Sequence, residues 1–527
     1  MKSNILLKKY FNEYLKLDPL YSIIVRNKGD KNIYTDYYSN EYIDKYTNIL
    51  KKYKNLSRNS NALYDKYLFT ICNNNLELIK LKKYLIPLNS YDNILINFKY
   101  NNELYYTINN DKDFYFLINR IKSLDKIVSS IIQRLNEGIR YKITISRFAC
   151  GLIIKKLKEY IKNKDICIIK VPSKYNNKFY HDIINKHYID NIKSVINFLE
   201  SKYIKHCYKG IGICNMKNNK GKLLYKKLII SEISLNKSPE NIFNIGLSEV
   251  KRIRELISGI MRQKSKYKRL TDFFKHMNDK NFIYKNDKEL YKDFENKRSF
   301  INNVIMKENF YKNVENYNIK FVDRKMENMS PAAYYYAMPK EKNAYIYINR
   351  SLTKYKYETF ALSIHEGIPG HHYQYRYFSK YKFPDYKIYS NNDSGFSEGW
   401  ALYSENIGNK YYNDDEYYGK LSYELLRSIR LVVDVGINYY NWSYKKAYNY
   451  MKKYSTLDND NIKNEIERYI NMPCQAITYK IGEMEILRLR DKYVNKKGMD
   501  IKEFHKRLFS KGIITLNLLE NTIYPRG

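Results

Sequence analysis

The stretch from His365 to Gln374 reads HEGIPGHHYQ and holds three of the eight histidines of the chain. A second stretch, from Ser397 to Glu405, reads SEGWALYSE. Imidazoles and carboxylates hold zinc in proteins about 2.0–2.2 Å from the ion, and a catalytic site leaves one position for water. The two stretches together therefore predict a metal site built from two histidines and one acidic residue.

The first stretch departs from the common HExxH pattern, in which histidines four residues apart share one face of a helix. Here Pro369 occupies the position four residues after His365. Six residues of an ideal helix turn about 240°, so His365 and His371 could not share an ion on a straight helix. Pro369 would clash with the carbonyl of His365, and Gly370 accepts backbone angles that other residues resist. We expect a break that turns His371 or His372 toward His365, and the spacing leaves both open.

Three acidic residues have expected roles. Glu366 is placed to take a proton from the attacking water and pass it to the leaving amine. Glu398 is the best candidate for the third ligand, and Glu405 lies two helical turns further on the same face, where it could orient a ligand histidine. Gly399 and Ala401 beside Glu398 favour close helix packing. Two solvated glutamates on an amphipathic helix remain the alternative.

These motifs resemble those of domain of unknown function family 885, which is identified with gluzincin-like zinc metallopeptidases related to carboxypeptidase Taq and angiotensin-converting enzyme. HEGIPGHHYQ is similar to the family's HExxPGHH segment, and SEGWALYSE to its EGWALYxE segment. Further similar segments run nearly from end to end, namely FNEYLKLDPLYS (11–22), GLSEVKRI (246–253), RLVVDVGI (430–437) and PCQAITYKIG (473–482). The resemblance implies a large helical zincin-like fold with a deep central cleft, a zinc ion, and hydrolysis of peptide bonds in short peptides.

The resemblance also implies several residue roles. The histidine directly after Pro-Gly is the constant one, which favours His371 over His372 as the second ligand. Gluzincins take their third ligand from a glutamate on a following helix, and that role falls on Glu398. They lay the substrate along an edge strand that precedes the metal helix, for which Tyr334–Ala337 or Tyr345–Ile348 would serve.

Four further positions follow from the same comparison. Tyr479 and Arg430 are candidates to stabilise the oxyanion of the tetrahedral intermediate, although Tyr479 could equally be a core aromatic residue. Asn438 stands where family members commonly have a histidine, and an amide cannot transfer protons as an imidazole can. Cys474 replaces a usual glycine, so the local backbone conformation there is in doubt.

The rest of the chain is typical of a mainly α protein. Apolar residues through 1–310 recur at spacings of three and four, as in Leu117, Ile121, Leu124 and Val128. No Gly/Ser-rich linker or internal repeat marks a domain boundary. We expect one metallopeptidase-like domain over 1–527, either undivided or with a helical lobe over 1–310 and a catalytic lobe over 311–527 that carries the metal motifs.

One stretch has the composition of strands instead. AAYYYA (332–337) and AYIYIN (344–349) flank a plausible turn at Met338–Asn343, which predicts a β-hairpin and a small antiparallel sheet. The segment YKYETFALSI (355–364) then returns to helical spacing and leads into the histidines. A strand followed by the metal-binding helix is therefore the expected order.

Charge, cysteines and hydropathy limit the remaining possibilities. The formal charge of +39 comes from lysines spread along the chain, so we expect a solvated surface and no nucleic-acid partner. The six cysteines form no CxxC pair and are expected to be reduced and mostly buried. No apolar run approaches a signal peptide or a membrane span, which predicts a cytoplasmic protein without a membrane partner.

We therefore expect a zinc metallopeptidase that acts on a peptide substrate. The competing interpretations are a catalytically inactive relative that acts as a binding protein, and a basic nucleic-acid-binding protein. The sequence does not determine whether the enzyme is an exopeptidase or an endopeptidase, or which end of the substrate it prefers. It also does not determine the oligomeric state.

Overall fold

The computed structural model describes residues 4–162, 167–264, 267–324, 327, 330–337, 343–391 and 393–524. These residues are mainly helical and include one three-stranded sheet, so the predicted fold class is confirmed at that level. Backbone contacts divide the chain into two compact units. The first comprises Met1–Ser231, Asp434–Tyr448 and Lys463–Pro473, and the second Glu232–Val433, Asn449–Ile462 and Cys474–Gly527.

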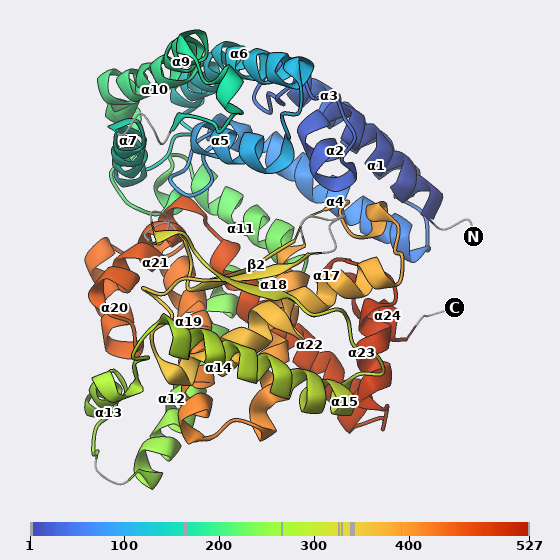
Figure 1. Ribbon diagram of the computed structural model, residues 1–527, viewed down its shortest axis with the longest axis vertical. Coiled ribbons are helices and arrows are strands. Elements are labelled where there is room, and N and C mark those ends of the chain that lie inside the picture. The colour runs from blue at the N-terminus through green and yellow to red at the C-terminus, as the bar shows by residue number, and fades with distance from the viewer. Residues whose placement is uncertain are drawn as a thin grey trace. The chain divides into compact units, whose positions relative to one another are not determined.

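The first unit is helical (Figure 1). Its helices are α1 (Ile5–Leu17), α2 (Pro19–Arg26), α3 (Asn40–Ser57), α4 (Leu63–Lys80), α5 (Ile94–Tyr105), α6 (Asp111–Tyr141), α7 (Arg147–Lys162), α9 (Lys178–Ile184) and α10 (Asp190–Ser201). Four further helices contribute residues to both units, namely α11 (Lys220–Ile233), α19 (Asp414–Asn438), α20 (Tyr444–Tyr454) and α21 (Asn459–Asn471).

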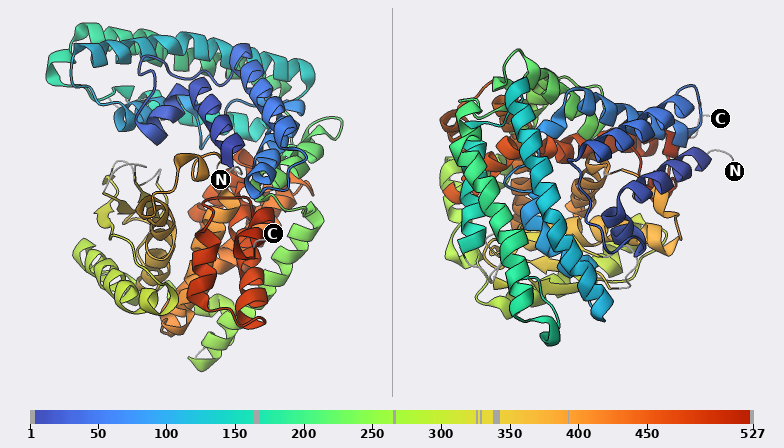
Figure 2. Two further views of the ribbon diagram at one scale, coloured as in Figure 1. Left: turned by 90° about the vertical axis from the view of Figure 1, so that its right-hand side faces the viewer. Right: turned by 90° about the horizontal axis from the view of Figure 1, so that it is seen from above.

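Helix α6 shows why the spacing of apolar residues predicts this unit correctly. Its side chains at spacings of three and four, from Leu117 through Val128, are all buried and join one hydrophobic core. The Asn110 side chain accepts a hydrogen bond from the backbone N–H of Asp113 at 3.0 Å and so caps the first turn. Helix α10 lies alongside α6 and adds its own apolar face to this core (Figure 2).

The second unit combines helices with the sheet. Its helices are α12 (Pro239–Gln263), α13 (Leu270–Met277), α14 (Asp287–Phe300), α15 (Met306–Asn309), α16 (Thr359–Leu362), α17 (His371–Lys380), α18 (Ser394–Ile407), α22 (Thr478–Arg490), α23 (Ile501–Phe509) and α24 (Glu520–Ile523). Helices α18 and α22 pack closely, because Gly399 of α18 faces Gly482 of α22 with no side chain between them.

The sheet has the strand order β1-β3-β2, with β1 at Asn318–Phe321, β2 at Ala333–Tyr336 and β3 at Tyr345–Ile348. Strands β2 and β3 pair antiparallel, as the predicted hairpin requires, although residues 338–342 of its turn lie outside the described residues. The expectation of an antiparallel sheet is wrong for β1, which pairs parallel to β3. A parallel partner strand comes from a segment that is distant in sequence, so the local pattern that predicts a hairpin cannot predict the pairing of β1 with β3.

None of the six cysteines, all of which lie in described parts of the chain, forms a disulfide; five are buried and Cys214 is half-buried, in agreement with the prediction. Within the part of the chain that the structure describes, no helix combines the length and the apolar character needed to cross a bilayer.

Candidate metal centre

The chain breaks its helix within the histidine motif, as the sequence predicts. Helix α16 continues into a wide π-helical turn at Ser363–Gly367, and Ile368 is extended, with φ −109° and ψ 128°. Helix α17 then begins at His371. His365 and His371 therefore belong to two different helical segments. The angle of about 240° that would separate them on one straight helix no longer applies.

Gly370 makes this break possible. A Cβ atom on Gly370 would lie 1.9 Å from the carbonyl oxygen of His365 and 2.3 Å from that of Ile364. Its N–H donates to the Ile364 carbonyl at 2.9 Å, and the indole N–H of Trp400 donates to the Pro369 carbonyl at 2.8 Å. The bend is thus held from within by a backbone bond and from outside by helix α18.

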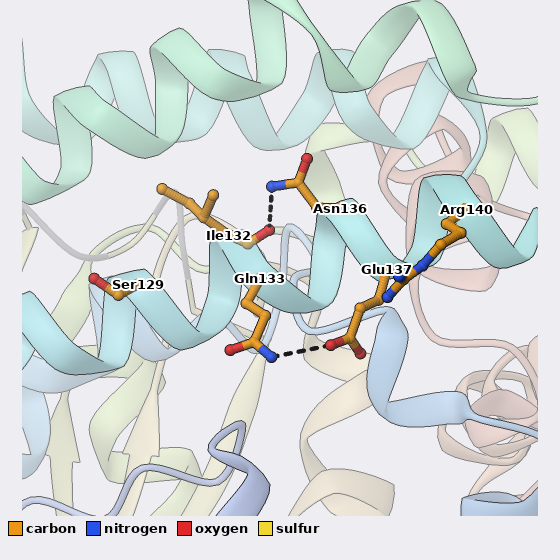
Figure 3. Close-up of a pocket in the computed structure, with 6 residues that line it drawn as sticks. All are labelled: Ser129, Ile132, Gln133, Asn136, Glu137 and Arg140. Carbon is orange, nitrogen blue, oxygen red and sulfur yellow. Dashed lines mark hydrogen bonds between the residues drawn. The ribbon is translucent and has the colours of Figure 1, made fainter.

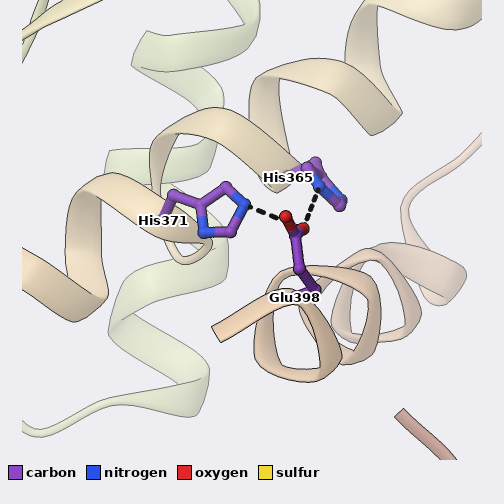
Figure 4. Close-up of side chains that lie close together, drawn as sticks. All are labelled: His365, His371 and Glu398. Carbon is purple, nitrogen blue, oxygen red and sulfur yellow. Dashed lines mark ion pairs between the residues drawn. The ribbon is translucent and has the colours of Figure 1, made fainter. Parts of the chain in front are cut away.

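The break brings three ligand-type side chains together. One ligand atom from each of His365, His371 and Glu398 lies within 4.8 Å of the others. The Oε2 atom of Glu398 is 3.4 Å from Nε2 of His371 and 3.8 Å from Nε2 of His365. Figure 4 shows both imidazoles turned toward this carboxylate, which projects from α18.

These separations fit a zinc ion. Ligand atoms about 2.1 Å from a tetrahedral ion lie about 3.4 Å from one another. The distance from Glu398 to His371 equals this value, and the distance from Glu398 to His365 exceeds it by about 0.4 Å. The His365 side chain is 4% exposed, whereas those of His371 and Glu398 are 14% and 22% exposed. One side of the cluster is therefore accessible to water, as a catalytic site requires.

Glu405 lies behind His365. Its Oε1 atom is 2.8 Å from Nδ1 of His365, and the carboxylate is almost fully buried. This contact fixes the tautomer in which Nδ1 carries the proton and Nε2 faces the other two ligands. The alternative of two solvated glutamates does not describe this helix, because Glu405 is 1% exposed.

The electrostatics of the cluster favour positive charge. Burial lowers the pKa of His365, but the carboxylates of Glu398 and Glu405 and the charge of Glu366 outweigh it and raise the pKa to about 9. Burial raises the pKa of Glu398, and its contacts with His365 and His371 more than reverse this, leaving that pKa well below its ordinary value.

The rival ligand His372 is turned away from the cluster. Its Nε2 atom is 2.6 Å from the carbonyl oxygen of Glu315, and its ring packs between Tyr317 and Tyr335 at centroid distances of 5.1 and 5.4 Å. Burial and the charge of Arg376 lower the pKa of His372 to about 4, against the opposing effect of its bond to Glu315. His372 is therefore a neutral core residue, and His371 is the histidine that joins the cluster.

Glu366, the expected general base, contacts the sheet. The backbone N–H of Tyr335 in β2 donates to Oε2 of Glu366 at 2.9 Å. Strand β2 is an edge strand and β3 is the central one, so of the two expected substrate strands only the segment around Tyr334–Ala337 lies at an edge. The carboxylate of Glu366 is thus held against the edge strand, directly after a ligand histidine in sequence.

The sequence interpretation missed two residues near Glu405. The Nη2 atom of Arg427 is 3.8 Å from Oε1 of Glu405, and its guanidinium stacks 4.8 Å from the ring centroid of Tyr423. Burial raises the pKa of Tyr423 well above its ordinary value, as do the charges of Glu358, Glu405 and Glu366, against the opposing charge of Arg427. A signal was available, because Tyr423 and Arg427 recur on α19 at helical spacing with Arg430.

Arg430 and Tyr479, the expected oxyanion-stabilising residues, contact each other. The guanidinium of Arg430, from α19, lies 4.8 Å from the ring centroid of Tyr479, at the start of α22. Arg430 is buried and Tyr479 is half-buried. Their action on a substrate remains a prediction.

The structure shows the surroundings of the two residues that the resemblance marks as departures from the family pattern. Asn438 lies in the first unit, where its side chain accepts from the N–H of Ile213 at 3.2 Å and donates to the carbonyl of Tyr469 at 3.0 Å. It therefore joins three chain segments of that unit. Cys474 has φ +73°, in the left-handed region that favours glycine, so the backbone has the conformation that the glycine implied by the resemblance would adopt.

A depression on the first unit offers no comparable chemistry. It is lined by Ser129, Ile132, Gln133, Asn136, Glu137 and Arg140, all from one face of α6 (Figure 3). Gln133 donates to Glu137 at 3.0 Å, and Asn136 donates to the backbone carbonyl of Ile132 at 3.0 Å. The depression is a feature of a helix surface, and the described residues that line it hold no cluster of ligand-type side chains like that of His365, His371 and Glu398.

Comparisons with known proteins give the family and the fold. No curated protein matches this chain significantly. The structure of a "putative lipoprotein" from Colwellia psychrerythraea is similar, with a TM-score of 0.86 at 20% identity over 98% of each chain. A "putative lipoprotein of unknown function" from Shewanella oneidensis has a TM-score of 0.78 at 13% identity over 99% of each chain. Identities this low show a shared fold alone. Residues 34–523, which include the whole cluster, match the family described as "bacterial protein of unknown function" (DUF885), and the chain belongs to that family.

Proposed function

We propose that this protein is a zinc metallopeptidase that hydrolyses peptide bonds in short peptides. His365, His371 and Glu398 are the proposed zinc ligands, and Glu366 is the proposed general base. One observation carries the proposal: three ligand-type side chains converge from two helical segments and α18, at separations that suit a tetrahedral ion.

A zinc ion bound there would polarise the substrate carbonyl and lower the pKa of a water molecule. The residues of the chain do the rest. Glu366 takes a proton from the attacking water and delivers it to the leaving amine. The Tyr335 N–H holds one carboxylate oxygen of Glu366 at 2.9 Å, which leaves the other oxygen for this transfer. Glu405 holds His365 in the orientation that a ligand needs.

Negative charge that develops on the substrate carbonyl oxygen requires hydrogen-bond donors. Arg430 and Tyr479 are the proposed donors from the sequence, and their mutual contact supports their acting as a pair. Tyr423 is a further candidate. Its phenol interacts electrostatically with Glu358, Glu405 and Glu366, which supports a place near the general base.

The order of elements supports a gluzincin-like arrangement. An edge strand precedes the first histidine segment, the general base directly follows the first histidine, and the third ligand comes from the next helix, α18. Gluzincins have the same order, in which the substrate lies along the edge strand. We therefore propose that relationship as the origin of the site.

The test combines metal analysis with peptide digestion. We expect the purified protein to bind about one zinc per chain and to cleave members of a peptide library, read by mass spectrometry, with loss of cleavage in chelator and recovery on zinc addition. Glu366→Gln should retain zinc and lose hydrolysis. Glu467→Gln makes the same chemical change on the half-buried Glu467 of α21 and should retain both.

Two results would count against this proposal. Full activity in Glu366→Gln would remove Glu366 from the mechanism. Bound zinc without cleavage of any library peptide would favour the inactive, peptide-binding alternative, which shares the ligands and lacks the reaction.

A further inference from the structure

One face of the sheet is rich in tyrosine. In the strand register Tyr334 pairs with Tyr347 and Tyr336 with Tyr345, so all four side chains project on the same face, and all four are half-buried. We call these four residues the tyrosine face. The opposite face carries buried residues, among them Ile346 and Ile348. A half-buried sheet face made of aromatic rings instead of charged or small polar residues suits a ligand that is itself aromatic or apolar.

The rings form a continuous layer centred on Tyr347. Tyr334 stacks on Tyr347 at a centroid distance of 5.1 Å and 13° between planes, and Tyr336 contacts Tyr347 edge-on at 6.3 Å. Tyr345 contacts Tyr347 at 6.1 Å, and at that end the Lys320 ammonium of β1 lies 3.9 Å from the Tyr345 ring centroid. A cation therefore already covers one end of the layer. The other end, Tyr334 and Tyr336, belongs to the edge strand β2.

One edge of β2 directs its backbone hydrogen-bonding groups toward the proposed general base, Glu366. The backbone N–H of Asn349 donates to the carbonyl of Ala332 at 2.9 Å, so Ala332 directs its backbone groups toward β3. Every second residue of the strand does the same, which includes Tyr334 and Tyr336. Tyr335 directs its backbone groups the other way, and its N–H reaches Glu366. Among the described residues no strand pairs with β2 on that side. The free edge of β2 and the general base thus meet at Tyr335.

We infer that the tyrosine face selects peptides with an aromatic side chain next to the scissile bond. This inference rests on the proposed function and names its substrate class. A peptide that extends the sheet at the free edge of β2 alternates its side chains between the two faces. Since the reacting bond lies near Tyr335, one residue that flanks it projects its side chain beside Tyr334 and Tyr336.

The chemistry of this position favours an aromatic ring over a cation or a small polar side chain. Same-face side chains on neighbouring strands have Cβ atoms about 4.5–5.5 Å apart, which is contact distance for two rings. Lys320 adds positive charge to the same face, which disfavours a lysine or arginine of the substrate. We therefore expect kcat/KM about tenfold higher for phenylalanine than for serine at this one position.

The experiment uses pairs of peptides that differ only by phenylalanine or serine at each position flanking the observed cleavage site. Full-length, zinc-loaded wild-type protein is compared with Tyr334→Thr, Tyr336→Thr and Tyr336→Phe. Threonine keeps a strand-forming side chain and removes the ring, whereas phenylalanine keeps the ring. Lys320→Thr is the matched control on the same face at the far strand. Binding of both peptides to zinc-loaded Glu366→Gln protein, measured by fluorescence anisotropy, reads the preference without hydrolysis.

We expect the phenylalanine preference to fall to about twofold or less in the two threonine variants and to persist in Tyr336→Phe and Lys320→Thr. Cleavage without a preference, or a preference that survives both threonine variants, would overturn the inference. Absence of any cleavage would instead contradict the proposed function, and the anisotropy preference would still decide the role of the tyrosine face.

Discussion

The close packing of α18 against α22 makes Gly399 the position where stability and the candidate metal centre are most directly coupled. A Cβ atom at Gly399 would lie 2.5 Å from the Cα and carbonyl carbon of Gly482. Ordinary van der Waals contact begins near 3.4 Å, so the two backbones would have to separate by about 0.9 Å. Both contacts are with backbone atoms, which cannot rotate away as a flexible side chain could.

Gly399→Ala should therefore lower the free energy of unfolding by about 1–3 kcal/mol, the usual cost of overpacking a well-packed interface. It should also weaken zinc binding, because Glu398 is the preceding residue and metal–ligand distances tolerate only about 0.2 Å of change. Urea unfolding gives the first quantity, and zinc content after dialysis against a weak chelator gives the second.

Gly259→Ala is the matched control, since a Cβ atom at Gly259 in α12 of the same unit meets nothing within 4 Å. That variant should gain roughly 0.5–1 kcal/mol from the better helix propensity of alanine and keep its zinc. If Gly399→Ala were as stable as Gly259→Ala and bound zinc equally well, neither the close approach of α18 to α22 nor its role in holding Glu398 could be correct.

Three further predictions concern single side chains. His371→Ala should lose zinc, whereas His372→Ala should keep it and lower stability because His372 is fully buried; equal zinc content in the two variants would contradict the assignment. Glu405→Gln should bind zinc about 10- to 100-fold more weakly by competition titration, because it loses the charge that orients His365, and unchanged affinity would exclude that role. Burial raises the pKa of Glu358 from 4.5 to about 8, so the folded protein holds this proton where the unfolded chain releases it. The free energy of unfolding should accordingly fall as pH rises between those values, by up to about 1.4 kcal/mol per unit, relative to Glu358→Gln in urea unfolding at two pH values inside the window. A constant difference would show that Glu358 ionises normally.

Much of the candidate site follows from local chemistry that the sequence displays. The break after His365 could be predicted because the effect of proline on the carbonyl four residues back is a local steric property, and the structure has the break where Pro369 and Gly370 stand. The close packing beside Glu398 could be predicted from Gly399 for the same reason. Cys474 is a similar case, since its φ of +73° is the conformation that a usual glycine implies.

Other features depend on segments that are distant in sequence, and no local pattern contains them. The parallel pairing of β1 with β3 joins residues about 27 positions apart, as in Asn318 with Tyr345. The burial of His372 depends on the carbonyl of Glu315 and on two tyrosines from other segments. The spacing alone therefore left His371 and His372 open. The two units likewise combine three chain segments each, a division that composition does not signal.

The carboxylates and the guanidinium around His365, His371 and Glu398 together determine the net charge of the cluster. Glu366, Glu398 and Glu405 supply three carboxylates, and Arg427 supplies one guanidinium 3.8 Å from Glu405, which leaves two negative charges when the histidines are neutral. Buried like charges are costly unless a cation compensates them. The raised pKa of His365 is one response to that imbalance, in which a proton supplies part of the missing charge. A divalent cation would supply all of it at a point that both imidazoles and Glu398 already face. This balance of charges supports the proposed dication over the alternative of a binding protein without a metal.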